Sequence, residues 1–287
     1  MLIQTHQLDE KQLMDLDALC ERCRAQDGNI VSIYRHLLEK YRGRPATLLC
    51  YKKQLNGFLA AFFFQEKTCE IALMVDPVVR RKGVASQLLR AILPMMKNES
   101  VQTVVFSSPH GLNNDWFERL GFCYQHSEYQ MQRTQHQPVL IDHDASIFRV
   151  ATHDDINDLC IIDNACFGTE QPNSLHRFHE LLNDSNQILF VIEKDKKPIG
   201  KAHLNWQQQG VRLTDIAILP QEQRRGYGNF LLANCINYAH SKNKYLIRLD
   251  VETNNKRALE LYTRLGFSIS NATDFWSISE IGLTGFL

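Results

Sequence analysis

The sequence predicts two consecutive α/β domains that are copies of one fold, because its main features occur twice within 287 residues. Each half opens with a strand-like run and a helical pattern, continues with a basic loop that contains small residues, and later has a Leu-Gly-Phe sequence. A repeat of about 140 residues is far longer than a solenoid unit and has the usual size of an independent domain. We therefore expect one domain at residues 1–134 and a second at residues 146–287.

The opening elements of both halves are predicted from their apolar periodicity. Residues 2–6 and 148–152 are short apolar runs with the character of strands. They lead into residues 11–23 and 155–167, where apolar residues recur at the spacing of one helix face. The polar segment between the halves, residues 133–146, contains Pro138 and lacks helical periodicity, as expected of a linker.

The second repeated feature is a basic loop that runs into a helical pattern. Residues 75–85 read Val-Asp-Pro-Val-Val-Arg-Arg-Lys-Gly-Val-Ala, and residues 218–228 read Ile-Leu-Pro-Gln-Glu-Gln-Arg-Arg-Gly-Tyr-Gly. Small residues let the backbone approach a ligand closely. The N-terminus of a helix offers unpaired N–H groups to an anion. Each loop is therefore predicted to hold a pyrophosphate, and we call the two loops the first and second cradle.

A third repeated feature follows each cradle at a similar distance. Residues 116–122 read Trp-Phe-Glu-Arg-Leu-Gly-Phe, and residues 261–267 read Leu-Tyr-Thr-Arg-Leu-Gly-Phe. The first glycine of the cradle and the later glycine are 38 residues apart in the first half and 40 in the second, from Gly83 to Gly121 and from Gly226 to Gly266. The order and spacing of all the segments therefore agree between the halves.

Taken in order, these segments resemble the GNAT superfamily of acyl-CoA-dependent N-acyltransferases, twice over nearly the whole chain. The second half fits best, with Gln223-x-x-Gly226-x-Gly228 followed by an Asn254-Asn255 pair and the Leu-Tyr-x-x-Leu-Gly-Phe run. The resemblance implies two tandem domains, each a mixed, mostly antiparallel sheet flanked by helices, with a splayed pair of strands that holds acyl-CoA. It also implies an N-acetyltransferase that moves an acetyl group from acetyl-CoA to a primary amine.

The resemblance also implies which residues contact acetyl-CoA, with one molecule in each half and no metal. The backbone of residues 216–218 would pair with the pantetheine arm, Asn255 would hydrogen-bond that arm, and the amides of residues 224–229 would hold the pyrophosphate. The expected contacts of the second half are Ile216, Ala217, Ile218, Arg224, Arg225, Gly226, Tyr227, Gly228, Asn229 and Asn255. Those of the first half are Met74, Val75, Arg80, Arg81, Lys82, Gly83, Val84, Ala85 and Ser86.

Acetyl transfer to an amine requires two proton movements. A lysine-like amine titrates near about 10.4 and must lose a proton before it attacks, and the CoA thiolate leaves more easily if it gains one. By resemblance, Tyr262 is the acid that protonates the thiolate. Asp250 is the first candidate for the base, with Asp215 as its rival. No cysteine aligns with the reacting centre, so we expect direct attack by the amine.

The first half departs from the pattern at the positions that would carry out chemistry. Counting back from Gly121, the replacements are Phe117 for Tyr262, Val105 for Asp250 and His110 for Asn255. A phenyl ring cannot protonate a thiolate, and valine cannot accept a proton. Because the first cradle keeps its small residues, we expect a first domain that binds CoA without catalysing transfer, and a catalytic second domain.

Composition restricts the partners and the compartment. The net charge of zero argues against a general nucleic-acid binder. The eight scattered cysteines favour a reducing compartment, the polar N-terminus lacks a secretory signal, and the apolar runs are too short for a membrane span, so we expect a cytoplasmic protein. The acceptor stays open between a protein lysine or N-terminus and a small amine. The alternative is a CoA-binding or partner-docking protein, including a bacterial effector that acts on host proteins after non-Sec delivery.

Overall fold

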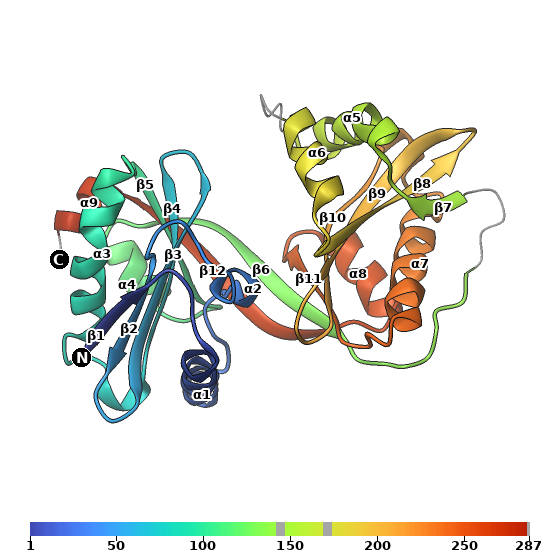
Figure 1. Cartoon of the computed structure of the whole chain (residues 1–287). Coiled ribbons are helices and arrows are strands. Elements are labelled where there is room, and N and C mark those ends of the chain that lie inside the picture. Colours follow the sequence, from blue (N-terminus) through green and yellow to red (C-terminus); the bar gives the residue numbers. More distant parts are fainter. Residues whose placement is uncertain (142–146, 169–173, 286–287) are drawn as a thin grey trace. The chain divides into compact units, whose positions relative to one another are not determined.

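The structure, a computed structural model of the chain, describes residues 1–141, 147–168 and 174–285 (Figure 1). Contacts divide the chain into two compact units. Unit 1 comprises Met1–Tyr129, Glu252–Asn254 and Asn271–Leu287, and unit 2 comprises Gln130–Val251 and Asn255–Ser270. The expected limits of the second domain, residues 146 and 287, lie outside the described residues.

Unit 1 is a sheet with helices on both faces (Figure 1). Its strands lie in the order β1-β2-β3-β4-β5-β12-β6, and β4 runs parallel to β5, whereas β1 to β4 and the β5–β12 pair are antiparallel. Helices α1 and α2 cover one face, and α3, α4 and α9 cover the other. The elements are β1 (Leu2–Thr5), α1 (Glu10–Asp27), α2 (Arg35–Leu38), β2 (Thr47–Tyr51), β3 (Leu55–Gln65), β4 (Thr68–Val75), the 3-10 turn η1 (Pro77–Val79), α3 (Val84–Asn98), β5 (Thr103–Pro109), α4 (Asn114–Arg119), β6 (Cys123–Arg133), β12 (Ser268–Ser279) and α9 (Glu280–Gly285).

Unit 2 repeats this arrangement. Its strands lie in the order β7-β8-β9-β10-β11-β6, and β10 runs parallel to β11. Helices α5 and α6 pack on one face, and α7 packs on β8, β9 and β10. The elements are β7 (Ile147–Val150), the 3-10 turn η2 (His153–Asp155), α5 (Ile156–Phe167), α6 (Ser174–Asn183), β8 (Gln187–Lys194), β9 (Lys197–Trp206), β10 (Val211–Ile218), the 3-10 turn η3 (Pro220–Glu222), α7 (Tyr227–Ser241), β11 (Ile247–Glu252) and α8 (Lys256–Arg264).

The opening strand and helix predicted for each half are confirmed, and the local sequence explains where the first helix begins and ends. Asp9 caps α1 by accepting a hydrogen bond from the backbone N–H of Gln12, while the Gln12 side chain accepts one from the Asp9 N–H. This reciprocal pair satisfies two N–H groups that have no partner inside the helix. At the other end, Gly28 adopts a φ of 78°, which glycine tolerates without strain.

The last strand of the chain, β12, belongs largely to unit 1. Seven residues of β12 pair with β5, from Thr273 opposite Pro109 to Ser279 opposite Thr103. The same segment places Trp276 in the hydrophobic core under α3. The contact-based units assign residues 271–285 to unit 1, whereas the expected division at 1–134 and 146–287 counts them with the second domain. Similarity between the halves identifies strands but not the strand with which each one pairs.

Candidate active site

The two cradles have the same backbone conformation. Arg81 and Arg224 have φ values of 58° and 63°, and Gly83 and Gly226 have φ values of 82° and 86°. Each glycine is the N-cap of a 15-residue helix, α3 or α7, and neither helix start has a side-chain cap. The first N–H groups of a helix lack intrahelical acceptors, and the helix dipole adds partial positive charge there. Both loops therefore have the backbone geometry of a phosphate site.

The first residue of each motif anchors its loop. Gln223 donates from Nε2 to the Ile218 carbonyl over 3.0 Å, and Arg80 donates from Nε to the Val75 carbonyl over 3.0 Å. The Arg80 guanidinium also forms a bidentate ion pair with Asp27, at 2.8 and 2.5 Å. Arg80 thus ties the end of β4 to α1, and its charge is already matched by a carboxylate.

The parallel strands beside the cradle diverge sooner in unit 2 than in unit 1. In unit 1, β4 and β5 stay paired for five positions, up to Ala72 opposite Ser107. In unit 2, β10 and β11 pair at two positions only, the last being Arg212 opposite Arg248. A bulge in β10 follows, where Asp215 has a φ of 50°. The splay that the family resemblance implies therefore begins earlier along the strands in unit 2.

Helix α8, the element that follows β11, carries Tyr262, and Asn255 lies directly before its first residue. Tyr262 is 7% exposed, and burial raises its pKa to about 12. Within the described part of the chain, its hydroxyl has no hydrogen-bond partner. Asn255 is the N-cap of α8, and its Oδ1 accepts from the Ala258 N–H over 3.2 Å. The cap leaves the Asn255 amide nitrogen free to orient as a donor, as a pantetheine contact requires. At the start of α7, a Cβ on Gly228 would lie 3.4 Å from Leu261 Cδ2, an ordinary contact with α8.

Asp250 lies on β11 and is ion-paired with Arg212 of β10. Its side chain is about a quarter exposed, at 24%. The ion pair leaves the carboxylate partly open to solvent.

Asp215 is held in a larger network of charges. It contacts Arg177 Nη2 at 3.1 Å and His203 Nδ1 at 3.3 Å. Arg177 also pairs with buried Asp163, which contacts the fully buried Lys201. Burial alone would raise the pKa of Asp215, but the hydrogen bond from His203 and the charges of Lys201 and Arg177 outweigh burial and hold the pKa well below its usual value. Such a carboxylate is a weak proton acceptor.

In unit 1, the position that corresponds to Tyr262 is part of an aromatic core. Phe117 is 5% exposed and stacks on Trp276 with ring centroids 5.4 Å apart. Phe122 meets Phe117 edge-on at 4.9 Å. In unit 1, packed aromatic rings therefore stand at the position that corresponds to the Tyr262 phenol of unit 2.

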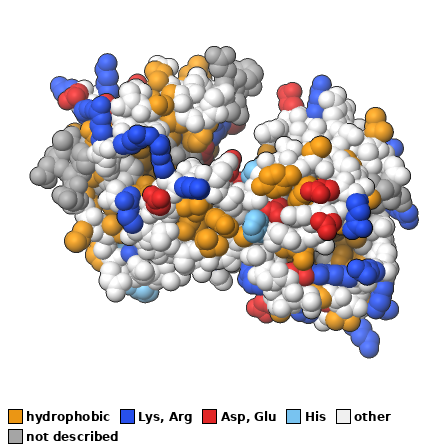
Figure 2. All heavy atoms as spheres, turned by 180° about the vertical axis from the view of Figure 1, so that it is seen from behind, with side chains coloured by type: hydrophobic (Ala, Val, Ile, Leu, Met, Phe, Trp, Pro, Cys, Tyr) orange, Lys and Arg blue, Asp and Glu red, His pale blue; other side chains and the backbone are white. Residues whose placement is uncertain are grey.

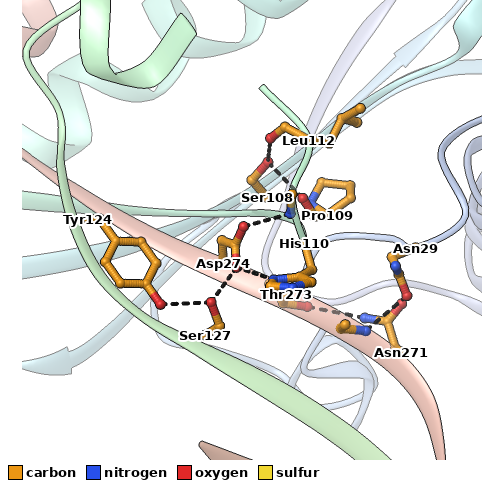
Figure 3. A network of polar contacts seen from close by, with 12 residues as sticks. Asn29, Ser108, Pro109, His110, Leu112, Tyr124, Ser127, Asn271, Thr273 and Asp274 are labelled. Atoms are coloured by element: carbon orange, nitrogen blue, oxygen red, sulfur yellow. Dashed lines mark hydrogen bonds and ion pairs between the residues drawn. The ribbon is translucent and has the colours of Figure 1, made fainter. Parts of the chain in front are cut away.

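The position that corresponds to Asn255 is tied to the chain's last strand (Figure 3). His110 donates from Nδ1 to Asp274 Oδ1 over 2.6 Å, and the Gly111 N–H donates to Oδ2 over 2.8 Å. Ser127 donates a further hydrogen bond to Oδ1, and Tyr124 contacts Ser127 at 2.8 Å. Asp274 is 2% exposed, and these donors compensate its burial. His110 thus helps to hold β12 beside β5.

Sequence comparison missed Glu70, which lies on β4 directly opposite Val105 of β5. Comparison of the two halves along the sequence puts Val105 at the position of Asp250, where a carboxylate is missing. The neighbouring strand β4 supplies a carboxylate, that of Glu70, directly beside Val105. The available signal was a single acidic residue inside the apolar run Cys-Glu-Ile-Ala-Leu-Met.

The family model for the acetyltransferase (GNAT) family matches residues 11–122 and 156–267, once in each repeat. The chain belongs to the GNAT acetyltransferase family. It is 26% identical over 288 residues to a mycothiol acetyltransferase of Mycobacteroides abscessus, a match that covers 92% of this chain and 95% of that protein. It is 29% identical over 106 residues to an uncharacterized N-acetyltransferase of Methanocaldococcus jannaschii, covering 34% of this chain and only 47% of that protein.

Solved GNAT structures share the fold over the whole chain. A GCN5-related N-acetyltransferase from Sphaerobacter thermophilus superposes with a TM-score of 0.75 at 14% identity, covering 97% of this chain and 96% of that one. A tandem GNAT protein from the clavulanic acid biosynthesis pathway superposes with a TM-score of 0.68 at 11% identity, covering 98% of both chains. The expected mixed α/β fold with two tandem GNAT domains is confirmed.

Three further findings concern membrane-spanning helices, metal sites and surface charge. None of the helices in residues 1–141, 147–168 and 174–285 is both long and apolar enough to cross a bilayer. The same residues contain no group of three or more His, Cys, Asp or Glu side chains arranged to hold a metal ion. Both basic and acidic side chains lie on the face shown in Figure 2.

Proposed function

We propose that this protein is an acetyl-CoA-dependent N-acetyltransferase in which unit 2 transfers the acetyl group to a primary amine by direct attack. The observation that supports this proposal is the combination found in unit 2: a cradle, a bulged and early-diverging β10, and the buried phenol of Tyr262 on α8. Unit 1 keeps the cradle but has Phe117 in place of the phenol.

In the proposed complex, the N–H groups at the start of α7 hold the pyrophosphate of acetyl-CoA. The backbone of residues 216–218, beyond the bulge, pairs with the pantetheine arm, and Asn255 donates from its amide nitrogen to the same arm. These contacts place the thioester between the diverging strands, near α8. Holding both reactants in one geometry lowers the entropic part of the barrier.

Two side chains then move the protons. Asp250 accepts a proton from the ammonium form of the acceptor, directly or through water, and the amine nitrogen attacks the thioester carbonyl carbon. The carbon–nitrogen bond forms, the carbon–sulfur bond breaks, and Tyr262 protonates the departing thiolate. The extra proton on the newly acylated nitrogen then passes through water to the Tyr262 phenolate, which leaves a neutral amide. Burial raises the pKa of Tyr262 to about 12, so its hydroxyl carries its proton at neutral pH. Asp250 is preferred to Asp215 because Asp215 contacts both Arg177 and His203, and its pKa is held well below the usual value.

Unit 1 is proposed to bind CoA without catalysing transfer, and the acceptor is either a protein amine or a small amine. Turnover of acetyl-CoA with a panel of amines distinguishes an enzyme from a protein that only binds CoA or docks a partner. Mass spectrometry of a cell lysate acetylated by the pure protein then identifies whether proteins or small molecules are modified, including host proteins if the chain acts as an effector.

Calorimetry is expected to find two acetyl-CoA sites per chain. Gly83→Glu and Gly226→Glu should each remove one site, because each puts a negative charge where a pyrophosphate should lie. Gly83→Asn and Gly226→Asn are the controls, since asparagine accepts a positive φ better than other side chains and adds no charge. A stoichiometry of one that survives Gly83→Glu would show that the first cradle does not bind acetyl-CoA.

Asp250→Asn and Asp215→Asn are expected to differ in their pH–rate profiles. A general base typically increases the rate of a reaction by about 10²–10⁴-fold. Asp250→Asn should therefore lower kcat, and the decrease should be largest at low pH, where little of the amine is unprotonated. Asp215→Asn should lower thermal stability by removing the carboxylate that contacts His203 and one of the two that contact Arg177, while keeping the shape of the profile. The reverse pattern would assign the base to Asp215.

A further inference from the structure

Arg133, the last residue of β6, is buried in unit 2 although its side chain carries a charge. It is 2% exposed, and its guanidinium pairs with no carboxylate among the residues that the structure describes. The guanidinium donates instead to neutral acceptors, which are the carbonyls of Leu265, Gln135 and Gln137, at 2.9, 2.6 and 2.7 Å, and His240 Nε2, at 3.1 Å. Removing a charge from water costs free energy, and these hydrogen bonds alone compensate the cost here.

The equivalent position in unit 1 is apolar. Arg133 and Ile278 correspond in the repeat, because each lies eleven residues after the phenylalanine of the preceding Leu-Gly-Phe sequence. Ile278 lies in the hydrophobic core under α3. A hydrocarbon side chain therefore suffices for the fold at this position. The guanidinium stands only in the unit that also has Tyr262.

Arg133 closes the end of α8, the helix that carries Tyr262. Leu265 is the C-cap of α8 and lies three positions beyond Tyr262. The last carbonyls of a helix lack intrahelical donors and carry partial negative charge, so a cation at that end is favourable. Arg133 Nε donates to the Leu265 carbonyl, while the Phe267 N–H donates to the Tyr262 carbonyl over 3.0 Å. The turn that carries the phenol is thus tied down at its outer end.

The chain that follows Arg133 lies over the same helix end. A Cβ on Gly266, whose φ is 87°, would lie 2.5 Å from Gln135 Oε1, so Gln135 rests directly on this glycine. His240, in the last turn of α7, accepts from Arg133 at Nε2, which therefore carries no proton. Burial and the charges of Arg133 and His136 lower the pKa of His240, which favours this neutral form. Arg133 thereby links the C-terminal ends of α7 and α8.

We propose that Arg133 is a positioning residue for acetyl transfer in unit 2, which holds the last turn of α8 so that the Tyr262 hydroxyl reaches the departing thiolate. The inference rests on the proposed function, because it takes Tyr262 as the acid, and extends it to a residue outside the cradle and the splayed strands. Arg133 is buried and acts through the helix rather than on acetyl-CoA. A displacement of about 1 Å can lower a rate about 10²-fold, so the effect belongs in kcat.

The test is a double-mutant cycle in the full chain, measured by steady-state acetyl transfer to an amine found active in the panel. Arg133→Met should lower kcat by about 10- to 100-fold, while the KM for acetyl-CoA stays within about twofold. Because Arg133 acts through Tyr262, adding Arg133→Met to Tyr262→Phe should change kcat by no more than about twofold. Arg264→Met, which removes an exposed guanidinium from the same turn of α8, is the matched control and should keep kcat.

Arg133→Lys keeps the test decisive if the methionine variant fails to fold. Lysine keeps the charge but lacks the planar fork of donors, so its kcat should lie between those of Arg133→Met and the unmodified chain, and the same cycle can be run with it. The CoA affinity of unit 2, measured by calorimetry in the Gly83→Glu chain, should be nearly unchanged and reports that the unit is folded.

The outcomes separate this inference from the proposed function. Unchanged kcat, a loss confined to KM or to CoA affinity, or losses that multiply in the cycle would each overturn the positioning role of Arg133 and leave Tyr262 as the acid. Full activity of Tyr262→Phe would overturn both.

Discussion

A chain that ends at Ser270 is expected to lose the cooperative folding of unit 1 while unit 2 stays folded. The truncation removes the β12 residues that pair with β5, and it exposes that strand's edge. It also removes Trp276, Ile278 and Leu283, which lie in the core under α3. Replacing one buried tryptophan by alanine typically costs about 3–5 kcal/mol, which is a large part of the 5–15 kcal/mol stability of a typical domain. Loss of all three side chains should therefore exceed what unit 1 can tolerate.

Hydrogen exchange read out by mass spectrometry can follow the two units separately. We expect peptides from β4 and β5 to lose protection in the truncated chain, and a synthetic peptide of residues 268–285 to restore part of it. Leu283→Ala should destabilise unit 1, whereas Ile281→Ala, in the same helix but 80% exposed, is the matched control. Full protection of β5 without β12 would contradict this prediction. By the same reasoning, residues 1–134 made alone should not fold stably.

Tyr262→Phe is expected to lower kcat by about 10²–10⁴-fold while leaving acetyl-CoA affinity nearly unchanged. The substitution removes one hydroxyl from a side chain that is 7% exposed and keeps the ring against Phe267. Because the hydroxyl has no hydrogen-bond partner within the described residues, its loss should change stability little. The measurement is steady-state acetyl transfer with an amine found active in the panel, together with calorimetry of acetyl-CoA binding.

Phe117→Tyr in unit 1 provides the matched control. It places a hydroxyl at the corresponding position, but inside the packed rings of Trp276 and Phe122. We expect no gain of activity and a loss of unit 1 stability, because the hydroxyl would be buried without a partner. If Tyr262→Phe keeps full activity, Tyr262 is not the acid, and the thiolate leaves unaided or takes its proton from water.

The sequence by itself was sufficient to predict the repeat, the two cradles and the family. These features are local: a glycine that adopts a positive φ, a proline six residues before it, and a helix that begins directly after it. Local backbone preferences act on neighbouring residues, so they leave a pattern that can be read from the chain in order. The roles proposed for Tyr262 and Asp250 followed from the same ordered pattern and await the kinetic tests.

Only the tertiary structure decided which strands lie together. It placed β12 beside β5, so that Asp274 and Trp276 pack in unit 1, most of which lies far earlier in the sequence. His110 and Asp274, for example, contact each other although they are 164 residues apart in the sequence. It also placed Glu70 opposite Val105. Pairing between distant strands depends on burial and on backbone hydrogen bonds that any residue can form. Such pairing leaves no periodic signal in either strand, so the carboxylate of unit 1 and the strand that completes its fold became visible only in three dimensions.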